Sequence, residues 1–161
     1  HEKIIGAITA ANAVVSLANG NIGQNLALPL VKNGELLKIS REIIRPFYEK
    51  KSQAALAAIH ESFSDDLPYA VHKSEGAFFL WLWFKDLPIT AKQLYERLKA
   101  RNVLVIPGHY FFYGLPERPR HADKCIRITF SQADSVVREG IQIIADEVKK
   151  AYGTLQQPRH S

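Results

Sequence analysis

The sequence predicts an α+β fold, an α/β two-layer arrangement in which a short sheet has helices packed on one face and follows a long bent helix. Two observations predict this class. The first half of the chain repeats apolar residues at helical spacing, whereas the second half alternates short apolar runs with helical patterns. The short runs contain many aromatic and β-branched residues, which favour strands. We therefore expect one small sheet in the second half.

The composition excludes several classes of protein. The chain has 161 residues, of which 47% are hydrophobic and 23% charged, as in an ordinary globular domain. Its 21 basic and 16 acidic residues give a net charge of +5 that is spread along the chain, so we expect no nucleic-acid binding. No run of about 18 apolar residues is present to span a membrane. The single cysteine, Cys125, excludes an internal disulfide framework and is typical of a reducing compartment. We expect a cytoplasmic protein, and we expect no metal site.

The first third of the chain is predicted to be helical. Residues 2–17 repeat apolar residues at helical spacing, and residues 17–23 have turn chemistry, with Asn-Gly followed by a second glycine. A short helix is expected at residues 24–31, ending at the sequence KNGE. Because the chain has no methionine and opens directly in this helical rhythm, we expect it to be a fragment of a longer protein.

Residues 35–63 form the longest helical pattern, with an apolar stripe along one side. Pro46 interrupts the stripe, and a proline inside a helix removes a hydrogen bond and bends the axis. Either one long helix bends there and links two structural units, or two packed helices meet at a tight joint.

The second half begins with the apolar run AFFLWLWF at residues 77–84. It predicts a strand that is covered on both faces, with its aromatic side chains in the core. A helix follows, because Thr90 and Gln93 have the spacing of a capping box, and Asn102 is the predicted end of that helix.

Two strands and one helix complete the pattern. Residues 103–108, VLVIPG, predict the second strand, and residues 125–130, CIRITF, predict the third. Residues 109–124 between them form a long loop, and a loop of this length inside a compact domain is often functional. The last helix is expected at residues 134–152, before Gly153 and a tail.

Arg127 lies in the middle of the third predicted strand. Side chains alternate across a strand, so Ile126 and Ile128 are expected on the core face, and Arg127 on the opposite face with Cys125 and Thr129. A guanidinium keeps its charge, and burying it without a partner is costly. Its planar fork on a stiff strand is well suited to bind a carboxylate through two parallel hydrogen bonds.

The acidic partner of Arg127 can be part of the protein or part of a ligand. An ion pair with an Asp or Glu of the same chain is the commoner arrangement for an arginine. The acidic residues of this region, however, all lie at the ends of elements, in loops or on a helix: Glu75, Asp86, Glu96, Glu117 and Asp123. Their placement favours a ligand carboxylate and leaves the internal ion pair open.

Two segments carry a resemblance to a known family. EGAFFLWLWFKDLPITAKQLYERLKARNVLVIPGHYFF and CIRITFS resemble the C-terminal part of class I aminotransferases, which are fold-type-I enzymes dependent on pyridoxal 5'-phosphate. The shared pattern is Glu-Gly before an aromatic run, a helix, a strand that ends in Pro-Gly, and a strand with a single arginine. FLWLWFKDLPIT and PGHYFF are most similar to the valine–pyruvate subfamily.

The resemblance implies roles for particular residues. The strand arginine of the family binds the α-carboxylate of the substrate, and this role falls on Arg127. Gly108 would turn the chain toward the substrate cleft, and His109 and Tyr110 would begin a loop near the pocket for the substrate side chain. The implied reaction transfers an amino group between valine, or a similar amino acid, and pyruvate. The implied enzyme is a homodimer of amino-acid biosynthesis.

The family's Schiff-base lysine lies in a motif that this sequence lacks. We therefore expect no catalytic residue in the chain, no covalently held pyridoxal phosphate, and no activity of the chain alone. The resemblance assigns residues 1–34 to the end of the cofactor domain and residues 35–152 to the linking helix and the small substrate-recognition domain. Residues 153–161 would be a tail, and residues 16–25 would lie near the dimer interface.

A function of a different class remains open. Strand–helix–strand arrangements also occur in non-catalytic regulatory or interaction modules that bind an amino acid, and Arg127 would bind the carboxylate there too. Tight binding of valine or pyruvate by the isolated chain without cofactor would favour such a module, because half of an active site should bind poorly. A nucleic-acid module would instead bind in a strongly salt-dependent manner.

Overall fold

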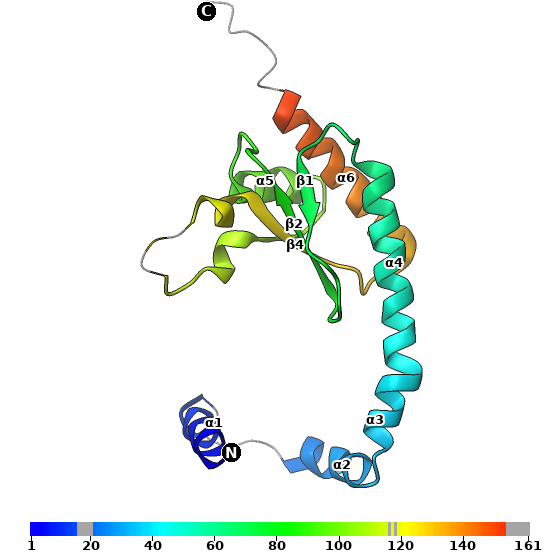
Figure 1. The fold of residues 1–161 in the computed structure, drawn as a ribbon, viewed down its shortest axis with the longest axis vertical. Coiled ribbons are helices and arrows are strands. Elements are labelled where there is room, and N and C mark those ends of the chain that lie inside the picture. Colours follow the sequence, from blue (N-terminus) through cyan, green and yellow to red (C-terminus); the bar gives the residue numbers. More distant parts are fainter. Residues whose placement is uncertain (16–20, 116, 118, 154–161) are drawn as a thin grey trace, which may run out of the picture. The chain divides into compact units, whose positions relative to one another are not determined.

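The computed structural model describes residues 1–15, 21–115, 117 and 119–153 (Figure 1). The regular elements follow in this order: α1 (Glu2–Val15), α2 (Asn21–Lys32), α3 (Glu35–Ile39), the π-helix η1 (Ser40–Ile44), α4 (Arg45–Ser62), β1 (Tyr69–Val71), β2 (Phe79–Phe84), α5 (Ala91–Lys99), β3 (Ile106–Pro107), the 3-10 helices η2 (Gly108–Phe111) and η3 (Arg120–Lys124), β4 (Cys125–Thr129) and α6 (Asp134–Gly153). The chain divides into two compact units, His1–Arg45 and Pro46–Ser161.

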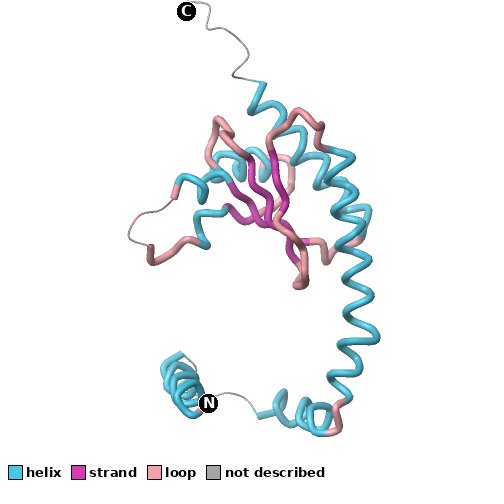
Figure 2. The backbone as a smooth tube through the Cα atoms, in the orientation of Figure 1, coloured by secondary structure: helices cyan, strands magenta, loops and turns pink. Residues whose placement is uncertain are grey.

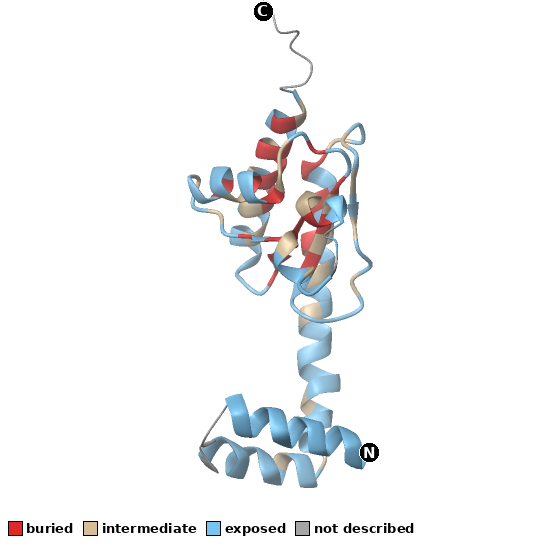
Figure 3. Ribbon diagram, turned by 90° about the vertical axis from the view of Figure 1, so that its left-hand side faces the viewer, coloured by how far each residue is buried: buried red, intermediate tan, exposed pale blue. Residues whose placement is uncertain are grey.

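The first unit is built of helices, as predicted. Every residue of α1 is exposed (Figure 3). The stop after α2 is confirmed, because Gly34 has a left-handed φ of 77° and the Asn33 side-chain oxygen accepts a hydrogen bond from the Glu35 N–H at 2.9 Å. The predicted turn at residues 17–23 lies largely outside the described residues, and its last three residues begin α2 instead.

Helical structure passes through Pro46 without a loop. The irregularity precedes the proline, because η1 is a π-helix in which the Arg45 N–H donates to Ser40 O, five residues back. Pro46 has no N–H to donate to the preceding turn, so a regular α-helical ladder cannot continue there. A long helix with a local irregularity is therefore the better of the two interpretations of this segment.

The second unit contains a sheet, whose strands are magenta in Figure 2. It is four-stranded and antiparallel, in the order β1-β2-β4-β3. The short strand β1 was not predicted, because three residues are too few to show an alternating pattern. The predicted strand at residues 103–108 is shorter than expected. Its first residue is still held by the preceding helix, since the Val103 N–H donates to Leu98 O at 2.9 Å, and only Ile106 and Pro107 pair with β4.

Helices α4, α5 and α6 pack against the core face of the sheet. The buried residues come from all three helices and from the strands: Ala55, Ala58, Ile59, Leu94, Leu98, Ile141, Ile144 and Val148 from the helices, and Leu80, Leu82, Phe84, Ile126 and Ile128 from the sheet. The predicted fold class, a short sheet with helices packed on one face, is confirmed. So is the capping box of α5, in which the Gln93 N–H donates to Thr90 Oγ1 at 3.2 Å and the Thr90 N–H donates to Gln93 Oε1 at 2.8 Å.

Strand β2 differs from the prediction in one respect that matters for function. Leu80, Leu82 and Phe84 are buried, whereas Phe79 is 40% exposed and Trp81 and Trp83 are only partly buried. The strand is therefore fully covered on one face only. Phe79, Trp81 and Trp83 lie on the other face. Among the described residues, no helix is both long and apolar enough to cross a lipid bilayer.

Candidate functional site

Arg127 lies at the centre of the more open face of the sheet. Its register partners are Trp81 on β2 and Ile106 on β3, so these three side chains share one face. The neighbours of Arg127 along β4, Ile126 and Ile128, are buried against the helices. The alternation predicted from the sequence is thus the one that the structure shows, and Arg127 itself is partly buried.

The guanidinium of Arg127 lies against two phenylalanine rings. Its carbon Cζ is 4.0 Å from the ring centroid of Phe79 and 4.8 Å from that of Phe111. A guanidinium over an aromatic ring is attracted by the negative charge of the ring face, and such stacking uses none of its N–H donors. The contacts therefore hold the group without occupying the edge that would bind an acid.

Among the described residues, Arg127 forms no ion pair with an acidic side chain. Within residues 1–15, 21–115, 117 and 119–153, the structure contains ion pairs at Lys51, Lys73, Arg101, Arg138 and Lys150, and none joins Arg127 to an Asp or Glu. Of the two alternatives open at the level of sequence, the ligand carboxylate is therefore the one that the geometry favours.

The loop that follows β3 covers part of this face. The Phe111 ring meets the Trp81 ring edge-on, with centroids 5.1 Å apart and planes at 84°, and the Phe112 ring lies 6.3 Å from Trp81. Phe79, Trp81 and Phe111 were not predicted from the sequence as neighbours of Arg127. For the two β2 residues a signal was present, since every second residue of FLWLWF faces away from the core; Phe111 had no comparable local signal.

Gly108, at the start of the loop, lies close to Cys125, the first residue of β4. A Cβ added at Gly108 would lie 2.7 Å from Ala122 O, 2.8 Å from Cys125 Cβ and 2.9 Å from Cys125 O. These distances are shorter than real Cβ contacts, so only glycine lets the two backbones approach this closely. Gly108 thereby places the start of the loop against β4, two residues from Arg127.

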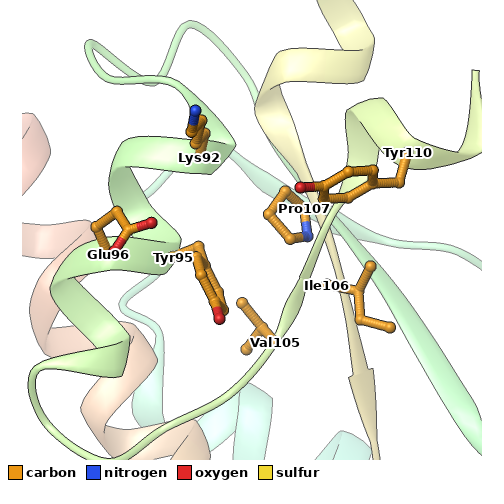
Figure 4. A pocket seen from close by; sticks show the side chains of 7 residues that line it. All are labelled: Lys92, Tyr95, Glu96, Val105, Ile106, Pro107 and Tyr110. Atoms are coloured by element: carbon orange, nitrogen blue, oxygen red, sulfur yellow. The ribbon is translucent and has the colours of Figure 1, made fainter.

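Tyr110, two residues after Gly108, lines a small open pocket of about 250 Å³ beside β3. The other lining residues come from α5 and from the segment 105–107: Lys92, Tyr95, Glu96, Val105, Ile106 and Pro107 (Figure 4). Ile106 is also the register partner of Arg127, so the pocket lies one strand away from the arginine. His109 contacts the Tyr110 ring at 4.2 Å between centroids and is not one of the lining residues.

Cys125 is not a nucleophile in this arrangement. Its side chain is fully buried, and burial raises the pKa of the thiol to about 11, with an opposing hydrogen bond to Trp81. The sulfur is 3.2 Å from His121 Nε2. A thiol with this pKa stays protonated near neutral pH, so Cys125 belongs to the packing beneath the site.

The residues around Arg127 do not fit pyridoxal phosphate itself. They are aromatic rings and a guanidinium, whereas the cofactor aldehyde needs an amine. Lys124, close to Arg127 in sequence, donates its ammonium to the backbone carbonyl oxygens of Leu87 at 2.5 Å and Ile89 at 3.1 Å. This lysine is engaged in joining η3 to the segment before α5. What the described residues do fit is a carboxylate.

Comparison with known proteins identifies relatives that share both sequence and fold. The chain is 45% identical over 152 residues to the valine–pyruvate aminotransferase of Escherichia coli (strain K12), a match that covers 94% of this chain and 36% of that protein. The crystal structure of valine–pyruvate aminotransferase from Salmonella typhimurium LT2 has a TM-score of 0.84 and 42% identity, covering 95% of this chain and 39% of that one. The chain thus spans little more than a third of the length of these relatives.

A second structure extends the likeness beyond this subfamily. Kynurenine aminotransferase from Pyrococcus horikoshii, solved in complex with PMP, KYN as substrates and KYA as products, has a TM-score of 0.71 and 28% identity over 92% of this chain. No family model matches the chain. The resemblance to aminotransferases, and to the valine–pyruvate type in particular, is confirmed by these relatives.

Proposed function

We propose that this chain is the C-terminal, substrate-recognising part of an aminotransferase that transfers an amino group between valine, or a similar amino acid, and pyruvate. The valine–pyruvate aminotransferases that the chain resembles support this class of enzyme. The single observation that carries the role of this segment is Arg127, a cation held on the open face of the sheet with an edge available to an acid.

Arg127 would bind the carboxylate of each substrate in turn. Valine and pyruvate both carry a carboxylate next to the carbon that exchanges the amino group, so one fork can serve both half-reactions. Bidentate hydrogen bonds fix the substrate at two atoms and orient the bonds of the α-carbon, which lowers the entropy cost of reaching the reactive geometry.

Pyridoxal phosphate, when bound to the whole enzyme, supplies the electron sink for reaction at the α-carbon. The described residues around Arg127 provide no amine for it, so we assign the Schiff-base lysine and the rest of the cofactor site to the remainder of the enzyme. The chain alone is expected to be inactive for this reason, and no residue of it is assigned a covalent role.

The domain assignment follows the same proposal. Residues 1–34 would end the cofactor domain, residues 35–152 would form the linking helix and the small domain, and residues 153–161 would be a tail. The division of the structure after Arg45 falls inside the proposed linking helix. A cytoplasmic homodimer of amino-acid biosynthesis is the setting that we propose for the whole enzyme.

The test is Arg127→Ala in the full-length enzyme that carries this segment. Removing one partner of a charge-assisted pair typically costs about 2–5 kcal/mol, so we expect kcat/KM to fall by at least about 30-fold in both half-reactions. Arg127→Lys keeps the charge without the planar fork, so its kcat/KM should lie between that of Arg127→Ala and that of the unchanged enzyme. Half-reaction rates that are unchanged for both valine and pyruvate would refute the role of Arg127.

A further inference from the structure

We propose that Phe79 and Phe111 are positioning residues for Arg127, which hold its guanidinium so that the N–H edge is presented to the incoming carboxylate. This inference deepens the proposed function and rests on it, since the two rings have a catalytic effect only if Arg127 binds substrate. Neither ring needs to touch the reacting atoms.

The need for positioning follows from the arginine side chain. It has several rotatable bonds, and holding it in one conformation costs conformational entropy that other contacts must offset. Its Cζ lies 4.0 Å from the Phe79 centroid and 4.8 Å from the Phe111 centroid. A carboxylate of the protein could hold the fork equally well, but it would occupy the donors that the substrate needs. Aromatic rings restrict the fork and leave those donors available.

Both rings are themselves held in place. Phe79 projects from β2 two residues before Trp81, and its ring also contacts Phe78 at 6.5 Å between centroids. Phe111 comes from η2 and packs edge-on against Trp81 at 5.1 Å. One ring therefore belongs to the sheet and the other to the loop. Together they link the position of the loop to the position of the guanidinium.

The arrangement has a kinetic consequence that differs from that of a side-chain pocket. A residue that acts through Arg127 should affect every substrate that carries an α-carboxylate, whatever its side chain. A residue that contacts the substrate side chain should instead change the preference between amino acids. Valine and alanine share the carboxylate and differ in the side chain, so the pair separates the two roles.

The experiment compares Phe111→Leu with Phe111→Tyr in the full-length enzyme. Loss of one exposed cation–π contact corresponds to a change of about two- to fivefold, so we expect Phe111→Leu to lower kcat/KM by up to about fivefold, and by the same factor for valine and for alanine. Phe111→Tyr keeps the ring and should stay within about twofold of the unchanged enzyme. Tyr113→Leu is the matched control, because Tyr113 lies in the same loop and is 97% exposed. Phe79→Leu repeats the test on the sheet side if the loop variant does not fold.

A double-mutant cycle decides whether the effect passes through Arg127. In an Arg127→Ala background, Phe111→Leu should cause no further loss. An equal loss in both backgrounds, an equal loss in Tyr113→Leu, or a loss for valine alone would overturn the positioning role while leaving the role of Arg127 intact. Full activity of Arg127→Ala by itself would instead overturn the proposed function, and this inference with it.

Discussion

At the scale of single residues, Gly108 sets the path of the loop that covers the arginine face. A Cβ at this position would lie 2.7 Å from Ala122 O and 2.8 Å from Cys125 Cβ, so Gly108→Ala must push the loop away from β4. Overpacking of this kind costs about 1–3 kcal/mol. We expect the free energy of unfolding of the 161-residue chain, measured by urea denaturation, to fall by that amount.

Gly140 offers the matched control for this substitution. It lies inside α6, and a Cβ there would have no other atom within 4 Å. Replacing a glycine inside a helix by alanine adds about 0.5–1 kcal/mol of stability, so Gly140→Ala should raise the free energy of unfolding. If Gly108→Ala were as stable as Gly140→Ala, the close approach of the two backbones would not be a feature of the folded protein.

The residues of the site differ in how far the sequence could predict them. The direction of Arg127 could be predicted, because alternation along a short strand depends only on its neighbours in sequence. Alternation also indicates that Phe79 and Trp81 face away from the core, but their position beside Arg127 depends on the pairing of β2 with β4, which no local pattern contains. Phe111 required the path of a loop, and that path depends on contacts such as the one at Gly108. The binding role of Arg127, like those of His109 and Tyr110, stays a prediction.

At the scale of elements, one carboxylate joins helix α6 to the turn that follows α5. Glu147 on α6 accepts hydrogen bonds from Arg101 Nη1 at 3.0 Å and from Lys150 Nζ at 2.8 Å. The hydrogen bond from Lys150 is the largest effect that lowers the pKa of Glu147, with a further contribution from Arg101 and an opposing one from burial. The folded protein thus favours the ionised form of this side chain.

The lowered pKa predicts how stability depends on pH. A carboxyl whose pKa is lower in the folded state stabilises the fold at pH values above its unfolded pKa, about 4.3 for Glu, and loses that contribution as pH falls through the folded pKa. Glu147→Gln should therefore lower the free energy of unfolding at pH 7. The difference from the unchanged chain should shrink steadily as the pH is lowered below about 4.3.

Glu139→Gln serves as the comparison, since Glu139 is an exposed residue of the same helix. Denaturation curves at several pH values give the free energy of unfolding of each variant relative to that of the unchanged chain. A constant difference between Glu147→Gln and the unchanged chain from pH 7 down to about pH 2, well below the ordinary pKa of Glu, would contradict the contribution of the ionised carboxylate.

The elements themselves were predicted in order and type where the pattern was long. The helices at 35–62 and 134–153 and the start of α5 at Thr90 agree with the structure because periodicity and capping are local properties. Strand β1 and the true length of β3 could not be predicted from local pattern. Both depend on which backbone groups find partners across the sheet, and at Val103 a helix carbonyl takes the hydrogen bond that a longer strand would have used.

At the scale of the whole molecule, the first unit exposes apolar side chains that a folded protein normally covers. Ile4, Ile5 and Ile8 on α1 are 61–63% exposed. Burying apolar surface away from water is favourable. We therefore expect the 161-residue chain to associate with itself through this unit. Static light scattering at several concentrations should give a mass above that of the monomer.

Charged substitutions separate this surface from the rest of the chain. Ile5→Glu combined with Ile8→Glu should shift the mass toward the monomer. Gln53→Glu combined with Gln142→Glu adds the same charge at exposed polar positions and should not. A monomeric chain at all concentrations would show that the exposed apolar residues of the first unit need no partner.

The central claim is that Arg127 recognises the acid group of the substrate and nothing else about it. The most direct measurement compares valine with isobutylamine, which is valine without its carboxylate, as amino donors for the full-length enzyme in single turnovers. Arg127→Ala should reduce the rate constant for valine by at least about 30-fold and leave the slow rate constant for isobutylamine unchanged. An equal reduction for both amines, or no reduction for valine, would contradict it.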